Sequence, residues 1–151
     1  MKQILIQESD FQEARKQIKK NKSKEIIFSG KTDDLNRKVL EKENIDILLL
    51  NLKSRKDRMK QRDSGFNHIL AKLAKKKYII IGINLDEILE EKSKKEKSEI
   101  LARIRQNIKL CNKNKLKMKF ISPSGKSKKD PHDLKSLGLV LGMPTWMVKF
   151  N

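Results

Sequence analysis

The sequence has little cysteine, histidine, proline or aromatic side chain, and these shortages exclude several classes of protein. Its 151 residues include one Cys, two His and three Pro, and aromatic residues make up 5%. A single cysteine excludes a disulfide scaffold and a cysteine-rich zinc module, and it fits a reducing compartment better than secretion. Two histidines without zinc-motif spacing leave few ligands for a phosphoesterase metal centre. We therefore expect a cytoplasmic protein that binds no cofactor itself.

The sequence also lacks long apolar runs. No stretch approaches the roughly 18 to 20 apolar residues that a membrane-spanning helix requires, and the apolar start of residues 1–10 is too short for a signal peptide. The low aromatic content also disfavours binding to a membrane surface, because interfacial helices usually carry Trp or Phe. A chain of about 150 residues usually forms one domain, so we expect residues 1–151 to form a single domain without membrane contact.

Basic residues outnumber acidic ones, and the excess is regional. The chain has 37 Lys and Arg against 19 Asp and Glu, a formal charge of +18. Residues 1–50 hold 11 basic and 9 acidic side chains (net +2), whereas residues 51–151 hold 26 and 10 (net +16). Lysine-rich codon usage would add charge everywhere, so it does not account for this sorting. A dense positive charge binds polyanions through counterion release, which favours nucleic acid as the partner.

Strand-like and helix-like segments alternate along the chain. The segments that favour strands are residues 2–7, 25–29, 45–51, 78–84 and 117–122. Helical periodicity marks five longer helices, and the expected N-caps of four of them are Ser9, Thr32, Ser64 and Asp130. Residues 85–91 favour a short helix, residues 53–62 (KSRKDRMKQR) a solvated loop, and residues 144–151 either a helix or a sixth strand.

The later strands are apolar at nearly every position, which is typical of a parallel sheet buried on both faces. A complete eight-stranded βα barrel takes about 250 residues and rarely fewer than 200. We therefore predict an α/β fold of TIM-barrel-like parallel βα repeats, in the form of a shortened or incomplete barrel of five to six strands. A doubly wound sheet is the alternative.

Motifs for enzymatic chemistry are weak. Residues 124–127 (SGKS) end like a phosphate-binding P-loop, but Phe120 stands where the first glycine of that motif is required. Cys111 falls on the apolar stripe of its helix, which favours core packing over a nucleophile. There is no G-x-S-x-G nucleophile elbow.

The basic residues instead follow helical spacing. His68, Lys72, Lys75 and Lys76 share one face of a predicted helix. On the later helix, Arg103 and Asn107 flank one side of the apolar stripe, and Arg105 and Lys109 flank the other. Five of the seven arginines are at positions 55, 58, 62, 103 and 105. Because arginine binds phosphate in a bidentate manner, this placement favours RNA-binding faces over ordinary solvated ones.

Four segments of the chain resemble those of a known protein family. Residues 62–74 (RDSGFNHILAKLA), the strand YIIIGINL, residues 100–111 (ILARIRQNIKLC) and residues 130–143 occur in the order and spacing of one family. Over residues 44–143 the chain resembles the family of protein component 3 of archaeal ribonuclease P, which includes the thirty-kilodalton subunit of eukaryotic ribonuclease P and MRP. Residues 1–43 match only as generic βα units.

The resemblance implies a TIM-barrel-like fold and a non-catalytic protein subunit. The RNA subunit, with Mg²⁺, would remove the 5′ leader of precursor tRNA, and this chain would bind and assist it. The implied partners are ribonuclease P RNA, precursor tRNA in the holoenzyme and a small ferredoxin-like protein subunit, and the implied protein assembly is a heterotetramer. The candidate functional residues are Arg62, Asn67, His68, Lys72, Lys75, Lys76, Arg103, Arg105, Asn107 and Lys109, of which Lys75 and Lys76 come from helical spacing alone. The alternatives are an independent metal-dependent nuclease or phosphoesterase, and a generic basic RNA-binding protein.

Overall fold

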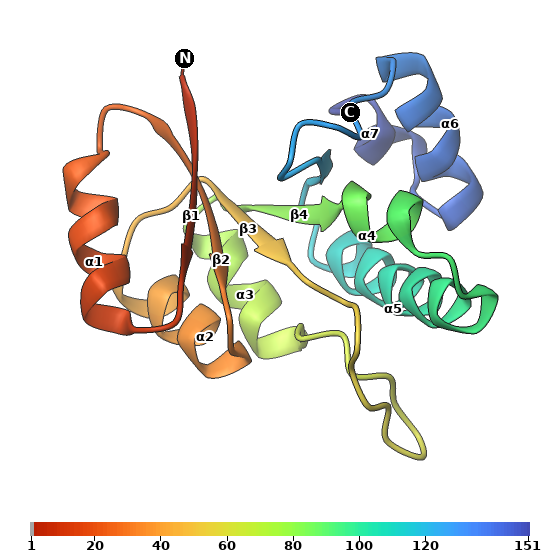
Figure 1. Ribbon diagram of the computed structural model, residues 1–151, viewed down its shortest axis with the longest axis horizontal. Coiled ribbons are helices and arrows are strands. Elements are labelled where there is room, and N and C mark those ends of the chain that lie inside the picture. The colour runs from red at the N-terminus through yellow and green to blue at the C-terminus, as the bar shows by residue number, and fades with distance from the viewer. Residues whose placement is uncertain (1) are drawn as a thin grey trace.

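A computed structural model describes residues 2–151 and shows one parallel sheet covered by helices (Figure 1). The strands are β1 (Gln3–Glu8), β2 (Glu25–Gly30), β3 (Ile47–Leu50), β4 (Ile80–Asn84) and β5 (Met118–Ile121). The helices are α1 (Phe11–Lys20), α2 (Asp33–Lys42), α3 (His68–Lys76), α4 (Leu85–Glu90), α5 (Lys94–Lys113), α6 (Pro131–Leu141) and α7 (Thr145–Val148). The ambiguous tail thus contains a short helix rather than a sixth strand.

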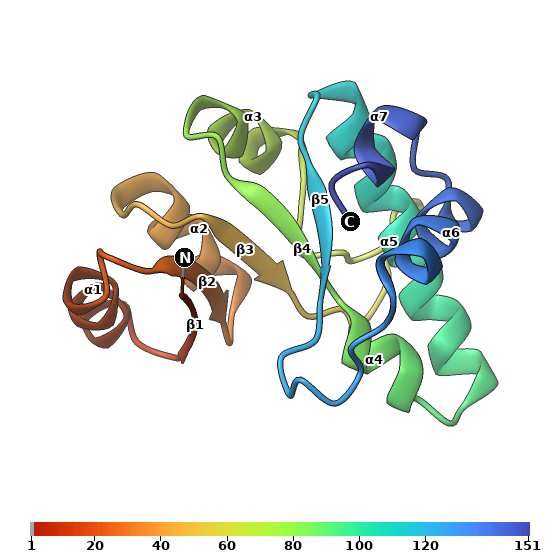
Figure 2. The same cartoon turned by 90° about the horizontal axis from the view of Figure 1, so that it is seen from above.

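Each strand pairs in parallel with the next strand along the chain, in the order β1-β2-β3-β4-β5. Within the described part of the chain, β1 and β5 do not pair with each other, so the barrel is open. In Figure 2 the helices follow one another in an arc outside the curved sheet. The predicted α/β fold with an incomplete, TIM-barrel-like set of parallel βα repeats is confirmed, with five strands.

Both faces of the sheet are largely buried at the three central strands, β2, β3 and β4, as their apolar sequences predict, whereas β1 is partly exposed. Phe28 and Leu48 are fully buried on the face that packs against the helices. Ile47 and Leu49 point to the opposite, inner face, where they form a smaller apolar cluster. Gly82 on β4 leaves room for this cluster, because a Cβ there would lie 3.1 Å from a methyl group of Leu49.

Two of the four predicted helix caps are correct. Thr32 caps α2, and Asp130 caps α6 with Pro131 at the first helical position. The predicted cap Ser9 is wrong, because the Asp10 carboxylate accepts the first amides of α1.

The cap of α3 is also three residues later than predicted. The side-chain oxygen of Asn67 accepts the amides of Ile69 and Leu70 at 3.0 Å each. Ser64 is buried in the preceding loop, where its hydroxyl donates to the carbonyl of Phe66. A short Asx side chain immediately before the helix reaches two amides, so it outcompetes the more distant serine.

The outer edge of β5 is covered by a side chain. The amide of Asn151 donates to the carbonyl of Met118 at 3.1 Å and accepts the N–H of Phe120 at 2.8 Å. These are the two groups that an adjacent strand would pair with. The Asn151 side chain therefore takes the place of one peptide unit beside β5.

Candidate nucleic-acid interface

A loop rich in arginine and lysine follows β3. We call residues 53–62 the basic loop; the loop projects from the body of the molecule beside α5 (Figure 1). It leaves the sheet at the carboxyl end of β3, the end at which βα barrels place their functional residues. The solvated loop predicted for this segment is confirmed as irregular backbone, but several of its backbone groups are bound by side chains of neighbouring elements.

Arg103 on α5 binds the first half of the loop. Its side chain is only 1% exposed, and its guanidinium donates to the carbonyls of Leu52 and Arg55 at 2.8 Å each and to the Asp57 carboxylate at 3.1 Å. The expectation that Arg103 belongs to an exposed cationic face is therefore wrong. The loop packs on that side of α5, and its carbonyls need a buried donor.

Asp57 joins the two halves of the loop. One carboxylate oxygen accepts the Asp63 amide at 2.9 Å and Arg103 at 3.1 Å, and the other accepts Arg62 at 3.0 Å. Desolvation would raise the pKa of Asp57, but the bonds from Arg103 and the Asp63 amide, together with the charge of Arg62, outweigh it and lower this pKa. The ionised carboxylate is thus the form that the folded loop stabilises.

Two further residues of α5 bind the second half. Gln106 donates to the carbonyl of Arg62 at 3.0 Å and to the hydroxyl of Ser64 at 3.2 Å. Asn107 is 2% exposed and donates weakly to the carbonyl of Ser64, at 3.4 Å. The expectation that Asn107 lies on an exposed face is therefore also wrong.

Two glutamates bind the backbone at the start of the loop. Glu87 on α4 accepts the amide of Leu52 at 2.8 Å, and its burial raises its pKa more than the neighbouring amides lower it. Glu96 on α5 accepts the amide of Ser54 at 2.8 Å. Ser54 has a φ of 58°, which is uncommon for a serine, so this contact stabilises a strained turn.

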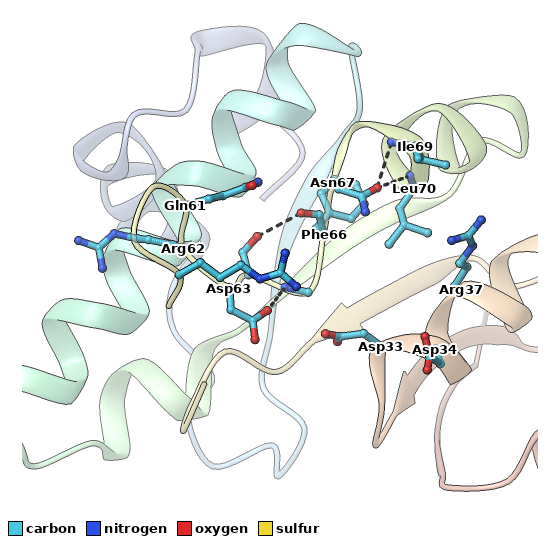
Figure 3. Close-up of a pocket in the computed structure, with 13 residues that line it drawn as sticks. Asp33, Asp34, Arg37, Gln61, Arg62, Asp63, Phe66, Asn67, Ile69 and Leu70 are labelled. Carbon is cyan, nitrogen blue, oxygen red and sulfur yellow. Dashed lines mark hydrogen bonds between the residues drawn. The ribbon is translucent and has the colours of Figure 1, made fainter. Parts of the chain in front are cut away.

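A hollow of mixed charge lies between the basic loop and α2, with a volume of about 360 Å³ (Figure 3). Its charged lining residues are Asp33, Asp34, Arg37, Arg58, Arg62 and Asp63. At its edge, Arg55 forms two bonds of 2.9 Å to Asp33 and one of 3.1 Å to Asp63. Burial alone would lower the pKa of Arg55, but these carboxylates raise it. Arg55 therefore stays charged, and its charge is balanced by carboxylates within the protein.

The opposite side of the loop faces α5 and forms what we call the basic groove, of about 620 Å³. Its lining residues are Asp57, Arg58, Met59, Lys60, Gln61, Arg62, Ala102, Arg105, Gln106 and Lys109. Five of these side chains are cationic and one is anionic. The single carboxylate, Asp57, is already bound by Arg103 and Arg62. Within residues 2–151, Arg58, Lys60, Arg105 and Lys109 form no ion pair.

The structure brings together only some of the residues that the sequence predicts. Arg62, Arg105 and Lys109 line the basic groove. The other exposed candidates, His68, Lys72, Lys75 and Lys76, lie on α3. Of the described residues, those that line the groove include none from α3. Asn67 acts as the helix cap.

Three residues at the tip of the loop line the groove but are not among the predicted functional residues. Arg58, Met59 and Lys60 lie at the tip of the basic loop. The sequence carries one signal for them, the density of basic residues directly after a doubly buried strand, but this density by itself predicts only a solvated loop. Only the packing of the loop beside α5 shows that these residues share a surface with Arg105 and Lys109.

The carboxyl ends of three strands carry neutral polar side chains that bind each other. The side-chain amide of Asn51 donates to the Ser29 hydroxyl, and the side-chain amide of Asn84 donates to the side-chain oxygen Oδ1 of Asn51, both at 2.8 Å. No group of three or more His, Cys, Asp or Glu side chains in residues 2–151 is arranged to hold a metal ion. Cys111 is buried in the core, and burial raises the pKa of its thiol, so the thiolate is disfavoured.

No helix among residues 2–151 is long and apolar enough to cross a membrane.

Sequence comparison connects this structure to known proteins. A family model described as RNase P subunit p30 matches residues 2–149. Ribonuclease P protein component 3 of Methanocaldococcus jannaschii is 30% identical over 151 residues, which cover 97% of this chain and 62% of that protein. The protein of the same name from Methanococcus maripaludis is 30% identical over 112 residues, which cover 73% of this chain and 45% of that protein. The chain thus spans 45% to 62% of the length of these relatives.

Structure comparison finds a known protein with a similar fold. One chain of a cryo-EM structure of archaeal ribonuclease P with mature tRNA superposes with a TM-score of 0.77 at 24% sequence identity. The match covers 97% of this chain and 62% of that chain. This likeness supports the TIM-barrel-like arrangement of the five parallel strands.

Proposed function

The chain belongs to the RNase P subunit p30 family, and from this membership we propose that it is an RNA-binding protein subunit of ribonuclease P. In this proposal it assists the catalytic RNA in removing the 5′ leader of precursor tRNA. The catalysis lies with the RNA and its Mg²⁺, and the chain contributes binding and positioning. Its partners are ribonuclease P RNA, precursor tRNA in the holoenzyme and a small ferredoxin-like subunit, assembled as a heterotetramer in the cytoplasm.

The observation that carries the proposal is the uncompensated charge of the basic groove. Four cationic side chains there have no carboxylate partner within residues 2–151. Such a cluster repels itself, and phosphates relieve this repulsion because they bring negative charge and release bound counterions. Arg58 and Arg105 add forked donors that match phosphate oxygens. We assign the RNA contact to Arg58, Lys60, Arg62, Arg105 and Lys109.

The exposed histidine and lysines of α3 form a second surface. His68, Lys72, Lys75 and Lys76 lie outside the groove. We propose that this surface contacts either a different part of the RNA or the protein partner. Arg103 and Asn107, being buried, act indirectly by holding the loop and α5 together.

Reconstitution of precursor-tRNA cleavage tests the proposal. Archaeal ribonuclease P RNA, the ferredoxin-like subunit and precursor tRNA are combined at limiting Mg²⁺, with and without this chain. We expect the chain to increase the rate of 5′-leader removal. We expect a variant with Arg105→Ala and Lys109→Ala to lose most of this stimulation. RNA binding without stimulation would contradict the proposal and favour a generic RNA-binding protein.

A matched control separates the groove from total charge. The variant with Arg37→Ala and Lys38→Ala removes two positive charges from exposed positions on α2. We expect this variant to stimulate cleavage as the unaltered chain does. An equal loss in both variants would contradict the assignment of RNA contact to the groove.

A further inference from the structure

The tip of the basic loop is a closed turn that displays an apolar side chain. The N–H of Arg58 donates to the carbonyl of Gln61 at 2.9 Å, and the N–H of Gln61 donates back to Arg58 at 3.4 Å. Met59 and Lys60 occupy the two positions between them. The side chain of Met59 is fully exposed, more so than any other large apolar side chain among residues 2–151.

The exposure of Met59 is built into a tethered loop. Arg103, Gln106 and Glu96 bind backbone groups on both halves of the loop, and Asp57 bonds one half to the other. A partner that binds the tip therefore meets a largely preorganised turn. Binding costs less conformational entropy than it would on a free loop, because the loop is already ordered.

The neighbours of Met59 define the chemistry of its partner. Met59 lines the basic groove together with Arg58, Lys60, Arg105 and Lys109, all of which lack an ion-pair partner within residues 2–151. The partner must therefore offer several negative charges and an apolar surface within the length of one short turn. An unstacked nucleotide has both, since its phosphates flank a flat aromatic base. In a regular duplex the base faces are covered by stacking, and an acidic protein surface has carboxylates without an adjoining aromatic face.

We propose that Met59 packs on the face of an unpaired, unstacked nucleotide of the bound RNA. The flanking phosphates lie on Arg58, Lys60, Arg105 and Lys109. The methionine sulfur and methyl group are polarisable and make favourable contacts with aromatic rings. The basic groove then distinguishes RNA with exposed bases from fully paired RNA. This inference rests on the proposed RNA-binding function and names the part of the RNA that the loop selects.

Binding to two RNAs tests the inference. One is a blunt-ended duplex with a three-nucleotide bulge, and the other is a blunt-ended duplex of equal phosphate number without unpaired nucleotides. Affinity is measured by fluorescence anisotropy at fixed salt for the unaltered chain, Met59→Ala and Met59→Leu. We expect Met59→Ala to weaken binding to the bulged RNA about tenfold, the size of a modest base-packing contact. We expect its affinity for the paired RNA to change less than about twofold, and Met59→Leu to retain most of the binding.

The control is Val140→Ala, which removes an exposed apolar side chain of α6 outside the groove. We expect this variant to bind both RNAs normally. An unchanged affinity of Met59→Ala for the bulged RNA, or an equal loss on both RNAs, would overturn the inference. Preferential loss of binding to the ferredoxin-like subunit would also overturn it, in favour of a protein contact.

The failure of this inference is distinguishable from failure of the proposed function. In the first case the unaltered chain still binds RNA and stimulates precursor-tRNA cleavage, and only the base-specific effect of Met59→Ala is missing. In the second case the unaltered chain gives no stimulation.

Discussion

The two sides of the basic loop use the same residue types in different proportions. On the side of α2, three aspartates face three arginines, so the mixed-charge hollow has no net formal charge. On the side of α5, five cations face one aspartate, and the groove has a formal charge of +4. Arg58 and Arg62 line both sides. Arg55 and Arg103, whose guanidinium groups bind carboxylates and carbonyls, build the loop, whereas Arg58 and Arg105 form no ion pair within residues 2–151 and are available for a ligand. Arg62 does both, because it pairs with Asp57 through one nitrogen and lines the groove. The difference shows that the number of arginines in a segment does not indicate function until their partners are known.

Arg103→Ala is expected to have the largest effect, because it removes the buried cation that supports the loop. The carbonyls of Leu52 and Arg55 would lose their donor, and the Asp57 carboxylate would lose one of its three donors. A carbonyl left without a donor costs about 1–3 kcal/mol, so we expect a loss of about 2–5 kcal/mol of unfolding free energy. Urea denaturation measures this loss. Arg105→Ala, two positions along α5 and exposed, is the control and is expected to stay within about 0.5 kcal/mol of the unaltered chain.

Equal losses of stability in these two variants would contradict the distinction between supporting and ligand-binding arginines. Arg103→Lys is a second check. A lysine keeps the charge but cannot present a planar fork to three acceptors, so we expect it to restore only part of the lost stability.

Gly65→Ala is expected to disturb the charge-balanced side. Gly65 has a φ of +66°, and a Cβ there would lie 2.7 Å from a guanidinium nitrogen of Arg55 and 2.9 Å from the Asp33 carboxylate. We expect a loss of about 1–3 kcal/mol of unfolding free energy, measured by thermal or urea denaturation. Gly125→Ala is a matched control, because Gly125 also has a positive φ, +73°, with open space around it. If the two variants lose equal stability, the contact of the new Cβ with Arg55 contributes nothing to the loss of unfolding free energy.

The variant with Arg105→Ala and Lys109→Ala is expected to change RNA binding without changing the fold. Each lost phosphate contact reduces the slope of log affinity against log salt by about 0.7 to 0.9. We therefore expect a slope flatter by about one to two units, measured by titrations between low and moderate salt. The variant with Arg37→Ala and Lys38→Ala should keep the original slope. Equal flattening in both variants would attribute binding to total charge instead of the groove.

The smallest expected effect is a contribution of Asp57 to acid sensitivity. The folded protein lowers the pKa of Asp57, so the ionised group stabilises the fold at pH values above its unfolded pKa of about 4. This stabilisation is lost as the pH falls below that value towards the folded pKa. We expect the stability difference between the unaltered chain and Asp57→Asn to shrink between pH 5 and about pH 3 in urea titrations. A difference that stays constant over this range would contradict this role of Asp57.

The fold was predictable from the sequence because its main signal is local. Strands such as β3 are apolar at every position, and this pattern fixes both their burial and the parallel sheet. The position of a cap is less well determined, since Ser64 and Asn67 both precede α3 and only backbone geometry selects the asparagine. Element boundaries therefore shifted while the order of elements did not.

The candidate site was predicted only in part. Helical spacing places Arg105 and Lys109 on one flank of the apolar stripe of α5, and both are exposed in the structure. The same spacing places Arg103 beside that stripe and cannot show that a loop some fifty residues earlier covers it. Burial of Arg103 depends on that long-range contact, which leaves no periodic signal in the sequence. The functional importance of Arg58 and Lys60 depends on the same packing.

The Asn151 side chain beside β5 has a consequence for self-association. An uncovered edge strand offers a row of peptide groups that a strand of another molecule can bind, which leads to aggregation. Asn151 occupies the central pair of these groups on β5, so an incoming strand would first have to displace it. Among the described strands, β1 pairs only with β2 and lacks such a cover. Oligomers or fibrils that form through the sheet are therefore expected to grow from β1.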